Sequence, residues 1–370
     1  MQLPKPFFVL APMDDVTDTV FRRIVGDCEP PDLYFTEFVN VDGLQSPGRE
    51  KLLPKLRFAE TERPIIAQIW GKNPENFHKT AKDLAGMGFD GVDINMGCPI
   101  ANVVKNGCCI AMINNRELAG EIIAAVREGV GGSLPTGQAG LPVSVKTRLG
   151  LNEVDYTWHE FLLNHKLNML TIHGRTAKQM SKVSADWQAI EHVRELRDQL
   201  SPTTLIVGNG DVKNRIKGEK LAKQHGLDGI MIGRGIFDDP FAFAATNPWA
   251  GYTKEQKIAL YRKHVQLFAD TYEQAETLRT YGDAVQGSNE QRLRRTQKYG
   301  ERAVQADDAA MRPKQERFMG SAHKQVRAVR SSRTLNKFCK VYIQGFDGAK
   351  ELRDQLMHAS SEQELLTLLG

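Results

Sequence analysis

Short runs of apolar and β-branched residues recur along the first 235 residues of the chain. They lie at residues 7–10, 33–36, 65–69, 91–94, 143–146, 169–172, 205–207 and 229–232. Between most of them lie stretches with apolar residues three and four positions apart, for example 74–87 and 117–127, which is the spacing of an amphipathic helix. The pattern predicts eight buried strands, each followed by a helix. This number of units, in a segment of this length, favours a (β/α)8 TIM barrel.

An open, doubly wound sheet is the competing topology for alternating strands and helices. Such sheets usually contain fewer strands, and the form that binds dinucleotides carries a GxGxxG motif after its first strand. That motif is absent from the start of this chain. The barrel is therefore the favoured architecture.

The strand pattern ends near residue 247, at Asn247-Pro248-Trp249-Ala250-Gly251. Beyond it, residues 254–279 and 334–369 have the composition and spacing of helices. We therefore predict two domains, a barrel over residues 1–247 and a smaller all-helical domain over 248–370. A glycine-rich segment, 129–140, predicts a loop before the fifth strand.

Composition narrows the class of protein. The apolar fraction is 41% and the charged fraction 25%, which is ordinary for a globular protein, and no apolar run is long enough to cross a membrane. No signal peptide is evident at the N-terminus. The five cysteines are odd in number and lack CxxC spacing, which argues against a disulfide scaffold or a metal site. We therefore expect a cytoplasmic protein without a bound metal.

The net charge of +4 is unevenly distributed. Residues 291–340 contain fourteen lysines and arginines against four acidic residues, a net charge of +10, so the rest of the chain sums to −6. A basic module on a near-neutral or acidic body indicates binding to a polyanion such as nucleic acid. A solvated helical face is the simpler alternative for such a run. The stretch 281–330 is polar enough to be partly flexible.

Polar residues follow nearly all the predicted strands, and in a barrel the carboxyl ends of the strands form the face that carries the active site. Glycine pairs after the last two strands, together with Arg234, suit a phosphate group. Lys146 in a strand is costly to bury without an anionic neighbour, and Gln68 can pair with the edge of a flat heterocycle. Flavin mononucleotide (FMN), which is flat and anionic, satisfies all of these. His173 fits the same site but equally fits a core histidine, and Cys98 alone fits a packed thiol.

Several motifs together resemble the tRNA-dihydrouridine synthases. They are Ala11-Pro12-Met13, Asn95-Met96-Gly97-Cys98-Pro99, Val145-Lys146-Thr147-Arg148, Thr171-Ile172-His173-Gly174-Arg175, Ala185-Asp186-Trp187, Gly208-Asn209-Gly210-Asp211 and Gly233-Arg234-Gly235. They follow the family's order across residues 7–240. The segment 338–357 is similar to the end of that family's helical RNA-binding domain.

The resemblance implies an enzyme that reduces a uridine in the D-loop region of tRNA, with FMN in the barrel and NADPH, or NADH, as the source of electrons. Cys98 then corresponds to the proton donor, and Asn95, Arg148 and Arg175 to residues near the substrate. The flavin site would comprise Pro12, Met13, Asp14, Gln68, Lys146, His173, Asn209, Gly210, Asp211, Gly233 and Arg234. A monomer is the default expectation for the oligomeric state.

Four positions depart from the family pattern. Asn102 stands where a lysine is usual, Cys108 and Cys109 where small residues are usual, and Ser181 where a tyrosine is common.

Two other functions remain possible from the sequence. One is an FMN-dependent dehydrogenase of the dihydropyrimidine or dihydroorotate type, acting on a free pyrimidine, against which the basic stretch argues. The other is a tRNA-binding protein without turnover, against which the intact Cys98, Lys146 and His173 argue.

Overall fold

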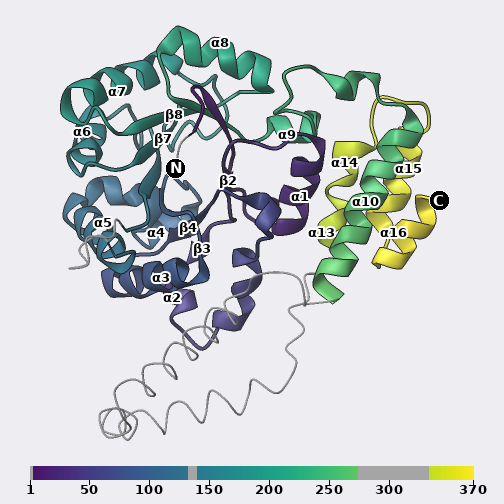
Figure 1. Ribbon diagram of the computed structural model, residues 1–370, viewed down its shortest axis with the longest axis horizontal. Coiled ribbons are helices and arrows are strands. Elements are labelled where there is room, and N and C mark those ends of the chain that lie inside the picture. Colours follow the sequence, from purple (N-terminus) through teal and green to yellow (C-terminus); the bar gives the residue numbers. More distant parts are fainter. Residues whose placement is uncertain (1–2, 132–139, 274–332) are drawn as a thin grey trace, which may run out of the picture.

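In the computed structural model, which describes residues 3–131, 140–273 and 333–370, nine parallel strands form one sheet (Figure 1). They are β1 (Phe7–Leu10), β2 (Tyr34–Phe35), β3 (Val39–Asn40), β4 (Ile65–Trp70), β5 (Gly91–Met96), β6 (Val143–Arg148), β7 (Met169–His173), β8 (Leu205–Asn209) and β9 (Gly229–Ile232). The order is β1-β9-β8-β7-β6-β5-β4-β2, and β3 also pairs with β4. A parallel bridge from Val9 to Leu33 joins β1 to the segment before β2, so the sheet closes. The predicted TIM barrel is confirmed.

Two details differ from the prediction. The second strand, expected at 33–36, is divided into β2 and β3, and both parts pair with β4. Several strands also run further than their apolar residues indicate, because the ladder of backbone hydrogen bonds continues where the side chains become polar. Asn95 and Arg148 therefore lie within β5 and β6, not in the loops after them.

Helices surround the barrel and alternate with its strands. They are α1 (Thr19–Cys28), α2 (Val41–Leu44), α3 (Pro74–Met87), α4 (Ala101–Lys105), α5 (Arg116–Gly129), α6 (Tyr156–Asn164), α7 (Trp187–Leu200), α8 (Arg215–His225) and α9 (Gly235–Asp238). Short 3-10 helices occur at η1 (Arg49–Lys51), η2 (Leu53–Leu56), η3 (Glu60–Glu62), η4 (Cys109–Asn114) and η5 (Pro248–Gly251). Of the predicted loop at 129–140, residues 132–139 lie outside the described residues, and Gly129 belongs to the end of α5.

The start and end of α3 show why the sequence places helices where it does. The Asn73 side chain accepts a hydrogen bond from the Glu75 backbone N–H, and Pro74 occupies the first helical position, where no donor is needed. Gly88 ends the helix in the left-handed conformation, with φ of 79°. The structure places α3 at the residues predicted for it.

Alternate residues of β1 belong to different cores. Phe7 and Val9 pack inside the barrel with residues such as Met231, whereas Phe8 and Leu10 pack between the sheet and the outer helices. This is the alternation expected when a strand is buried on both faces. Large side chains therefore fill the interior, and any cavity must lie at its mouth.

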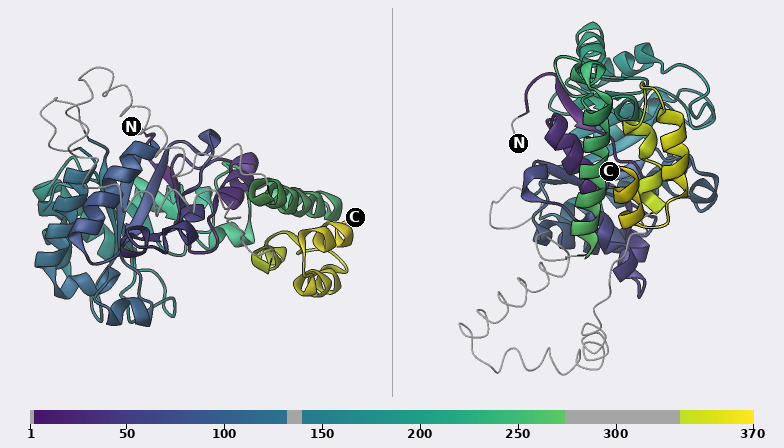
Figure 2. Two further views of the ribbon diagram at one scale, coloured as in Figure 1. Left: turned by 90° about the horizontal axis from the view of Figure 1, so that it is seen from below. Right: turned by 90° about the vertical axis from the view of Figure 1, so that its right-hand side faces the viewer.

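The C-terminal region is helical, as predicted, but it is divided into shorter helices. They are α10 (Lys254–Glu273), α13 (Arg333–Asn336), α14 (Cys339–Tyr342), α15 (Ala349–His358) and α16 (Glu362–Leu368). These helices form a bundle that projects from one side of the barrel (Figure 2). Its buried side chains belong to the same cluster as the outer barrel helices, and the rings of Phe21 and Phe338 lie 4.9 Å apart across the junction. The stretch 281–330 lies wholly outside the described residues.

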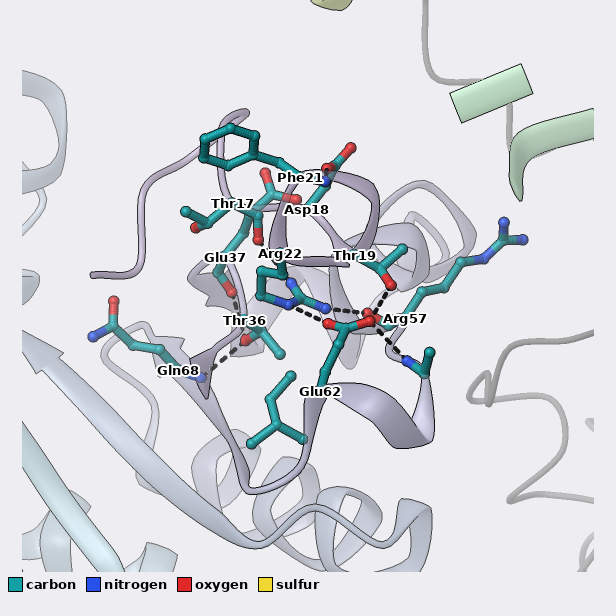
Figure 3. A network of polar contacts seen from close by, with 12 residues as sticks. Thr17, Asp18, Thr19, Phe21, Arg22, Thr36, Glu37, Arg57, Glu62 and Gln68 are labelled. Atoms are coloured by element: carbon teal, nitrogen blue, oxygen red, sulfur yellow. Dashed lines mark hydrogen bonds and ion pairs between the residues drawn. The ribbon is translucent and has the colours of Figure 1, made fainter. Parts of the chain in front are cut away.

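A buried ion pair lies beneath the loop that connects β1 to α1 (Figure 3). Arg22 Nε donates to Glu62 at 2.5 Å, and the other nitrogens of its guanidinium donate to the carbonyls of Thr17 and Arg57 at 2.7 and 2.6 Å. The Thr19 hydroxyl also donates to Glu62. These contacts tie the start of α1 to the segment before β4, and so hold the loop that carries Pro12 and Met13.

Candidate active site

Cys98 lies in a turn that Asn95 holds at the end of β5. The Asn95 side-chain oxygen accepts hydrogen bonds from the backbone N–H groups of Gly97 and Cys98, both at 3.0 Å. A Cβ at Gly97 would lie only 3.2 Å from the backbone of Thr147 on the neighbouring strand. The turn can therefore approach β6 closely only because residue 97 is glycine. Its effect is to place the partly buried Cys98 thiol just beyond the barrel strands.

The surroundings of Cys98 favour the thiolate more than those of any other cysteine in the chain. A hydrogen bond from the Cys109 thiol is the largest of the effects that lower the pKa of Cys98 to about 7. Burial opposes it, while the Ile100 backbone and the Arg148 and Lys146 cations act in the same direction. All five cysteines are among the described residues, and burial or neighbouring thiols raise the pKa of the other four. Low pKa with partial exposure is the mark of a reactive cysteine.

A buried polar network connects this turn to the barrel interior. Asn95 donates to Gln68 at 2.9 Å, and Gln68 donates to Asp93 at 2.7 Å. Ser144 donates to the other oxygen of Asp93 at 2.5 Å. All of them are buried, and burial raises the pKa of Asp93 to about 6. Gln68 therefore orients Asn95, and through it the Cys98 turn.

A cavity of about 850 Å³ opens at the carboxyl ends of the strands, which is large for a small-molecule site. Among the described residues its lining includes six cations, Lys146, Arg148, Arg175, Lys213, Lys217 and Arg234, and two acids, Asp211 and Asp238. A Cβ at Gly233 would point toward Ala11 and Met13, at 3.5 and 4.0 Å, so glycine leaves the wall between β1 and β9 open. The cavity has the charge and the open wall that a phosphorylated planar molecule needs.

Lys146 and His173 face the cavity from β6 and β7. Burial lowers the pKa of Lys146 to about 8; Arg148 adds to this effect and Asp93 opposes it. Burial, and then the nearby Lys146 and Arg148, hold the pKa of His173 well below its ordinary value. At neutral pH, Lys146 is therefore a cation beside a neutral imidazole, and an anion in the cavity would compensate its charge.

Arg175 and Asp211 form a paired part of the cavity wall, in which Arg175 Nη1 also lies 3.1 Å from His173 Nε2. Arg175 is only 2% exposed, and it donates to Asp211 at 2.5 Å and to the Val183 carbonyl at 2.6 Å. Arg234 is exposed and lies 3.4 Å from the second oxygen of Asp211. Asp211 thus joins the loops after β7, β8 and β9, and Arg234 keeps donors free for a ligand.

Arg148, predicted to lie near the substrate, also holds the site together. Its Nε donates to the Gly97 carbonyl at 2.9 Å, and Nη1 donates to the carbonyls of Thr176 and Met180, both at 3.2 Å. It therefore links the Cys98 turn to the loop after β7.

The structure brings most of the residues predicted from sequence to this cavity. Pro12, Met13, Lys146, Arg148, His173, Arg175, Asn209, Gly210, Asp211, Gly233 and Arg234 line it. Cys98, Asn95 and Gln68 lie beside it in the network described above. Asp14 does not line the cavity and pairs with Lys55. The functional roles of all these residues remain predictions.

Asp14 belongs to a group of carboxylates, with Asp15 and Glu37, whose oxygens lie within 4.8 Å of one another. The Lys55 ammonium contacts Asp14 and lies 3.7 Å from Asp15 and 3.9 Å from Glu37. A lysine thus already supplies positive charge to this group.

Other residues of the site were not found from the sequence. They are Asp93 in the network, Cys109, which lowers the pKa of Cys98, and Met180, Val212, Lys213, Lys217, Phe237 and Asp238 in the cavity wall. An acidic residue inside an apolar strand was the available signal for Asp93. The lysines lie in a loop and a helix after β8, where nothing in the local sequence separates them from surface lysines.

Among the described residues, no helix combines the length and the apolar character that crossing a membrane requires.

A family model described as "Dihydrouridine synthase (Dus)" matches residues 9–316. A "Probable tRNA-dihydrouridine synthase" of Staphylococcus aureus (strain COL) is 39% identical over 371 residues, which cover 100% of this chain and 93% of that protein. A "Probable tRNA-dihydrouridine synthase 2" of Bacillus subtilis (strain 168) is 40% identical over 372 residues, covering 100% and 94%.

Proposed function

This chain belongs to the dihydrouridine synthase family of enzymes, and from that premise we propose that it reduces a uridine in the D-loop region of tRNA to 5,6-dihydrouridine. The likeness to curated relatives over the whole chain, helical region included, favours tRNA over a free pyrimidine as the substrate. One observation carries the chemical assignment. Of five cysteines, only the one at the mouth of the barrel has a lowered pKa and partial exposure.

The cavity residues fit FMN. Lys146 and His173 would contact the ring system, and the glycine loops at 208–211 and 233–235, with Arg234, would hold the phosphate. Bound FMN would supply a hydride to one carbon of the uracil double bond, with NADPH or NADH as the source of its electrons. The open Gly233 wall and the excess of cations support this fit.

Cys98 would hold the proton that is transferred to the other carbon of the uracil double bond. A pKa of about 7 suits a general acid, because the group is protonated often enough to act and releases its proton readily. Asn95 and Arg148 hold the two polar atoms of the peptide bond that precedes Cys98, which keeps the thiol in one position.

A base must leave the tRNA stack to reach this site, and an open barrel mouth suits an extruded base. The basic stretch would contact the phosphates and supply affinity, not sequence choice. Three basic residues of the segment 291–340 belong to the described part of the chain: Arg333, Lys337 and Lys340. All three are exposed, and Lys337 contacts the β1–α1 loop through the Asp15 carbonyl. The tRNA would therefore lie across the helical bundle toward the cavity.

The test is the mass of uridines in an unmodified tRNA transcript after incubation with the protein, FMN and NADPH. We expect dihydrouridine, mapped by nuclease digestion to the D-loop region. Cys98→Ala should lower the rate by about 10²–10⁴-fold while flavin and tRNA binding persist. Cys28→Ala is the matched control, because burial raises the pKa of Cys28 to about 12 and it lies on α1. Full activity of the Cys98→Ala variant would refute the role of Cys98.

A further inference from the structure

The loop between β7 and α7 presents an exposed apolar side chain to the cavity. Six large apolar side chains are exposed in the described part of the chain: Ile100, Val154, Met180, Val183, Ile216 and Met357. Single exposed apolar residues are ordinary on a protein surface and need no function. Met180 differs from the other five because it lines the cavity, where its side chain is 43% exposed. The proposed reaction leaves this side chain without a role.

Hydrogen bonds fix the backbone of this loop, so Met180 keeps its position at the cavity. The N–H groups of Ala177 and Lys178 donate to carbonyls of the loop after β6, at 2.8 and 2.9 Å. The Thr176 N–H donates to the Gln179 side chain at 2.8 Å, and the Gln179 N–H donates to the Thr176 hydroxyl at 3.3 Å. Met180 itself has φ of 54°, a left-handed conformation that residues other than glycine rarely adopt. Such a conformation persists only where the surrounding contacts hold it, and it is frequent at binding sites.

Arg148 joins Met180 to the turn that carries Cys98. Its Nη1 donates to the Met180 carbonyl at 3.2 Å, and its Nε donates to the Gly97 carbonyl at 2.9 Å. One guanidinium and two hydrogen bonds therefore separate the backbone of Met180 from the peptide bond that precedes Cys98. A molecule in the cavity that contacts the Cys98 thiol is therefore within reach of the Met180 side chain.

We propose that Met180 is the apolar contact for the uracil ring of the tRNA nucleotide that is reduced, an inference that rests on the proposed function. An extruded base has lost the neighbours on its two faces and gains apolar contacts in the pocket that receives it. A thioether is flexible and polarisable and packs favourably against a flat ring. Ser181, the next residue of the cavity wall, is small and polar and offers little contact of this kind. Met180 thus holds the base beside Cys98.

The charge of the loop favours a nucleotide within RNA over a free pyrimidine. Lys178 and Lys182 lie two positions before and two positions after Met180, and both are exposed. No acidic residue occurs between Lys178 and Ala185. Phosphates on either side of the target nucleotide would complement these lysines, whereas a free pyrimidine has no phosphate. The loop therefore combines an apolar contact for the base with positive charge for the RNA backbone.

The experiment measures how fast saturating unmodified tRNA oxidises the flavin of the enzyme after reduction with NADPH, together with the affinities for tRNA and FMN. Met180→Asn should slow the oxidation about three- to tenfold, because the contact with the base is lost. Its tRNA affinity should persist, because the phosphate contacts supply it. Asparagine tolerates a positive φ, and Met180→Gly, which also suits it, should be slowed likewise. Met180→Leu should retain most of the rate, since leucine has a similar apolar volume.

Two further variants separate the base contact from surface and charge effects. Val154→Asn is the matched control, because Val154 is 38% exposed on the neighbouring loop after β6 and does not line the cavity. Its oxidation rate should equal that of the wild type. The double variant Lys178→Gln and Lys182→Gln should weaken tRNA binding and reduce its salt dependence, while the rate at saturating tRNA stays close to that of the wild type.

The outcomes distinguish this inference from the proposed function. If the wild type forms dihydrouridine and Met180→Asn reacts as fast, the inference alone is overturned. A lower FMN affinity in Met180→Asn would also overturn it, because the thioether would then contact the flavin. Unchanged tRNA affinity in the double lysine variant would contradict RNA as the occupant of the loop. A wild type that forms no dihydrouridine would refute the proposed function, and this inference with it.

Discussion

Glu62 and Asp93 are both buried carboxylates, but the structure compensates them differently. Glu62 accepts hydrogen bonds from the guanidinium of Arg22 at 2.5 Å, the Thr19 hydroxyl and the Ala59 backbone. The side chains that donate to Asp93 are neutral, Gln68 at 2.7 Å and Ser144 at 2.5 Å. Lys146 acts on Asp93 only through its charge.

This difference distinguishes Glu62, whose charge serves only the fold, from Asp93, whose charge acts on Lys146 at the candidate active site. The guanidinium of Arg22 is used entirely within the fold, because its other nitrogens donate to backbone carbonyls. Lys146, in contrast, is not bonded to Asp93 and keeps its ammonium in the cavity wall. An anion bound in the cavity would therefore contact the Lys146 ammonium, whereas the Arg22 guanidinium is fully occupied without a ligand.

The largest expected effect comes from breaking the structural pair. Arg22→Met leaves the Glu62 carboxylate buried without a cation and should lower the free energy of unfolding by about 3–5 kcal/mol. Urea unfolding at pH 7 measures it. The control is Lys79→Met, which breaks an exposed pair with Glu75 and should cost at most about 0.5 kcal/mol. Similar losses of unfolding free energy in Arg22→Met and Lys79→Met would contradict the structural role of the Arg22–Glu62 pair.

Removing the charge of Asp93 should raise the free energy of unfolding, whereas Arg22→Met should lower it. Its folded pKa of about 6 exceeds the unfolded value, so the stability it contributes is complete below about pH 4 and is lost as the pH rises through 6. Asp93→Asn should therefore gain about 1–3 kcal/mol relative to the wild type between pH 4 and pH 7. Urea unfolding across that range tests this. If the free energy of unfolding of Asp93→Asn instead falls relative to the wild type between pH 4 and pH 7, the Asp93 carboxylate is well compensated in the folded state.

A smaller effect is expected on flavin binding. Because the pKa of Lys146 is about 8, FMN affinity should fall by about tenfold between pH 7 and pH 9 as the ammonium loses its proton. Asp93→Asn should move the midpoint to lower pH, since Asp93 raises that pKa, and Lys146→Gln should remove this step. Quenching of flavin fluorescence gives the affinity. An unchanged profile in Lys146→Gln would exclude Lys146 as its source.

The smallest effect compares one hydroxyl at each carboxylate. Thr19→Val removes one donor from Glu62, which keeps Arg22 and the Ala59 N–H, so the cost should be about 1 kcal/mol. Ser144→Ala leaves Asp93 with Gln68 as its side-chain donor and should also raise the pKa of Asp93. Both hydroxyls lower the pKa of the carboxyl that they bond, so each variant should raise that pKa. For Ser144→Ala the cost should be larger at pH 7 than at pH 5, because wild-type Asp93 has a pKa of about 6. Urea unfolding at both pH values measures it, and an equal cost of Ser144→Ala at pH 5 and pH 7 would contradict the effect on Asp93.

Much of the fold was accessible from the sequence. Apolar runs and helical spacing give strands and helices within a few residues, and α3 at its observed bounds, because local hydrogen bonding and capping set those limits. The rim motifs lead to Lys146, His173 and the glycine loops, because in a parallel barrel every strand ends at the same face. The family follows from the same motifs.

Tertiary structure alone decided which of these polar groups interact. Gln68, for which the sequence predicts a place at the flavin, uses both ends of its amide in the fold, accepting from Asn95 and donating to Asp93. Cys109 carried no signal of its own, since its effect on the pKa of Cys98 depends on how η4 packs against β5. A sequence shows which chemical groups are present and where strands end. The distances that shift a pKa depend on packing between residues far apart in the chain, and no local pattern encodes them.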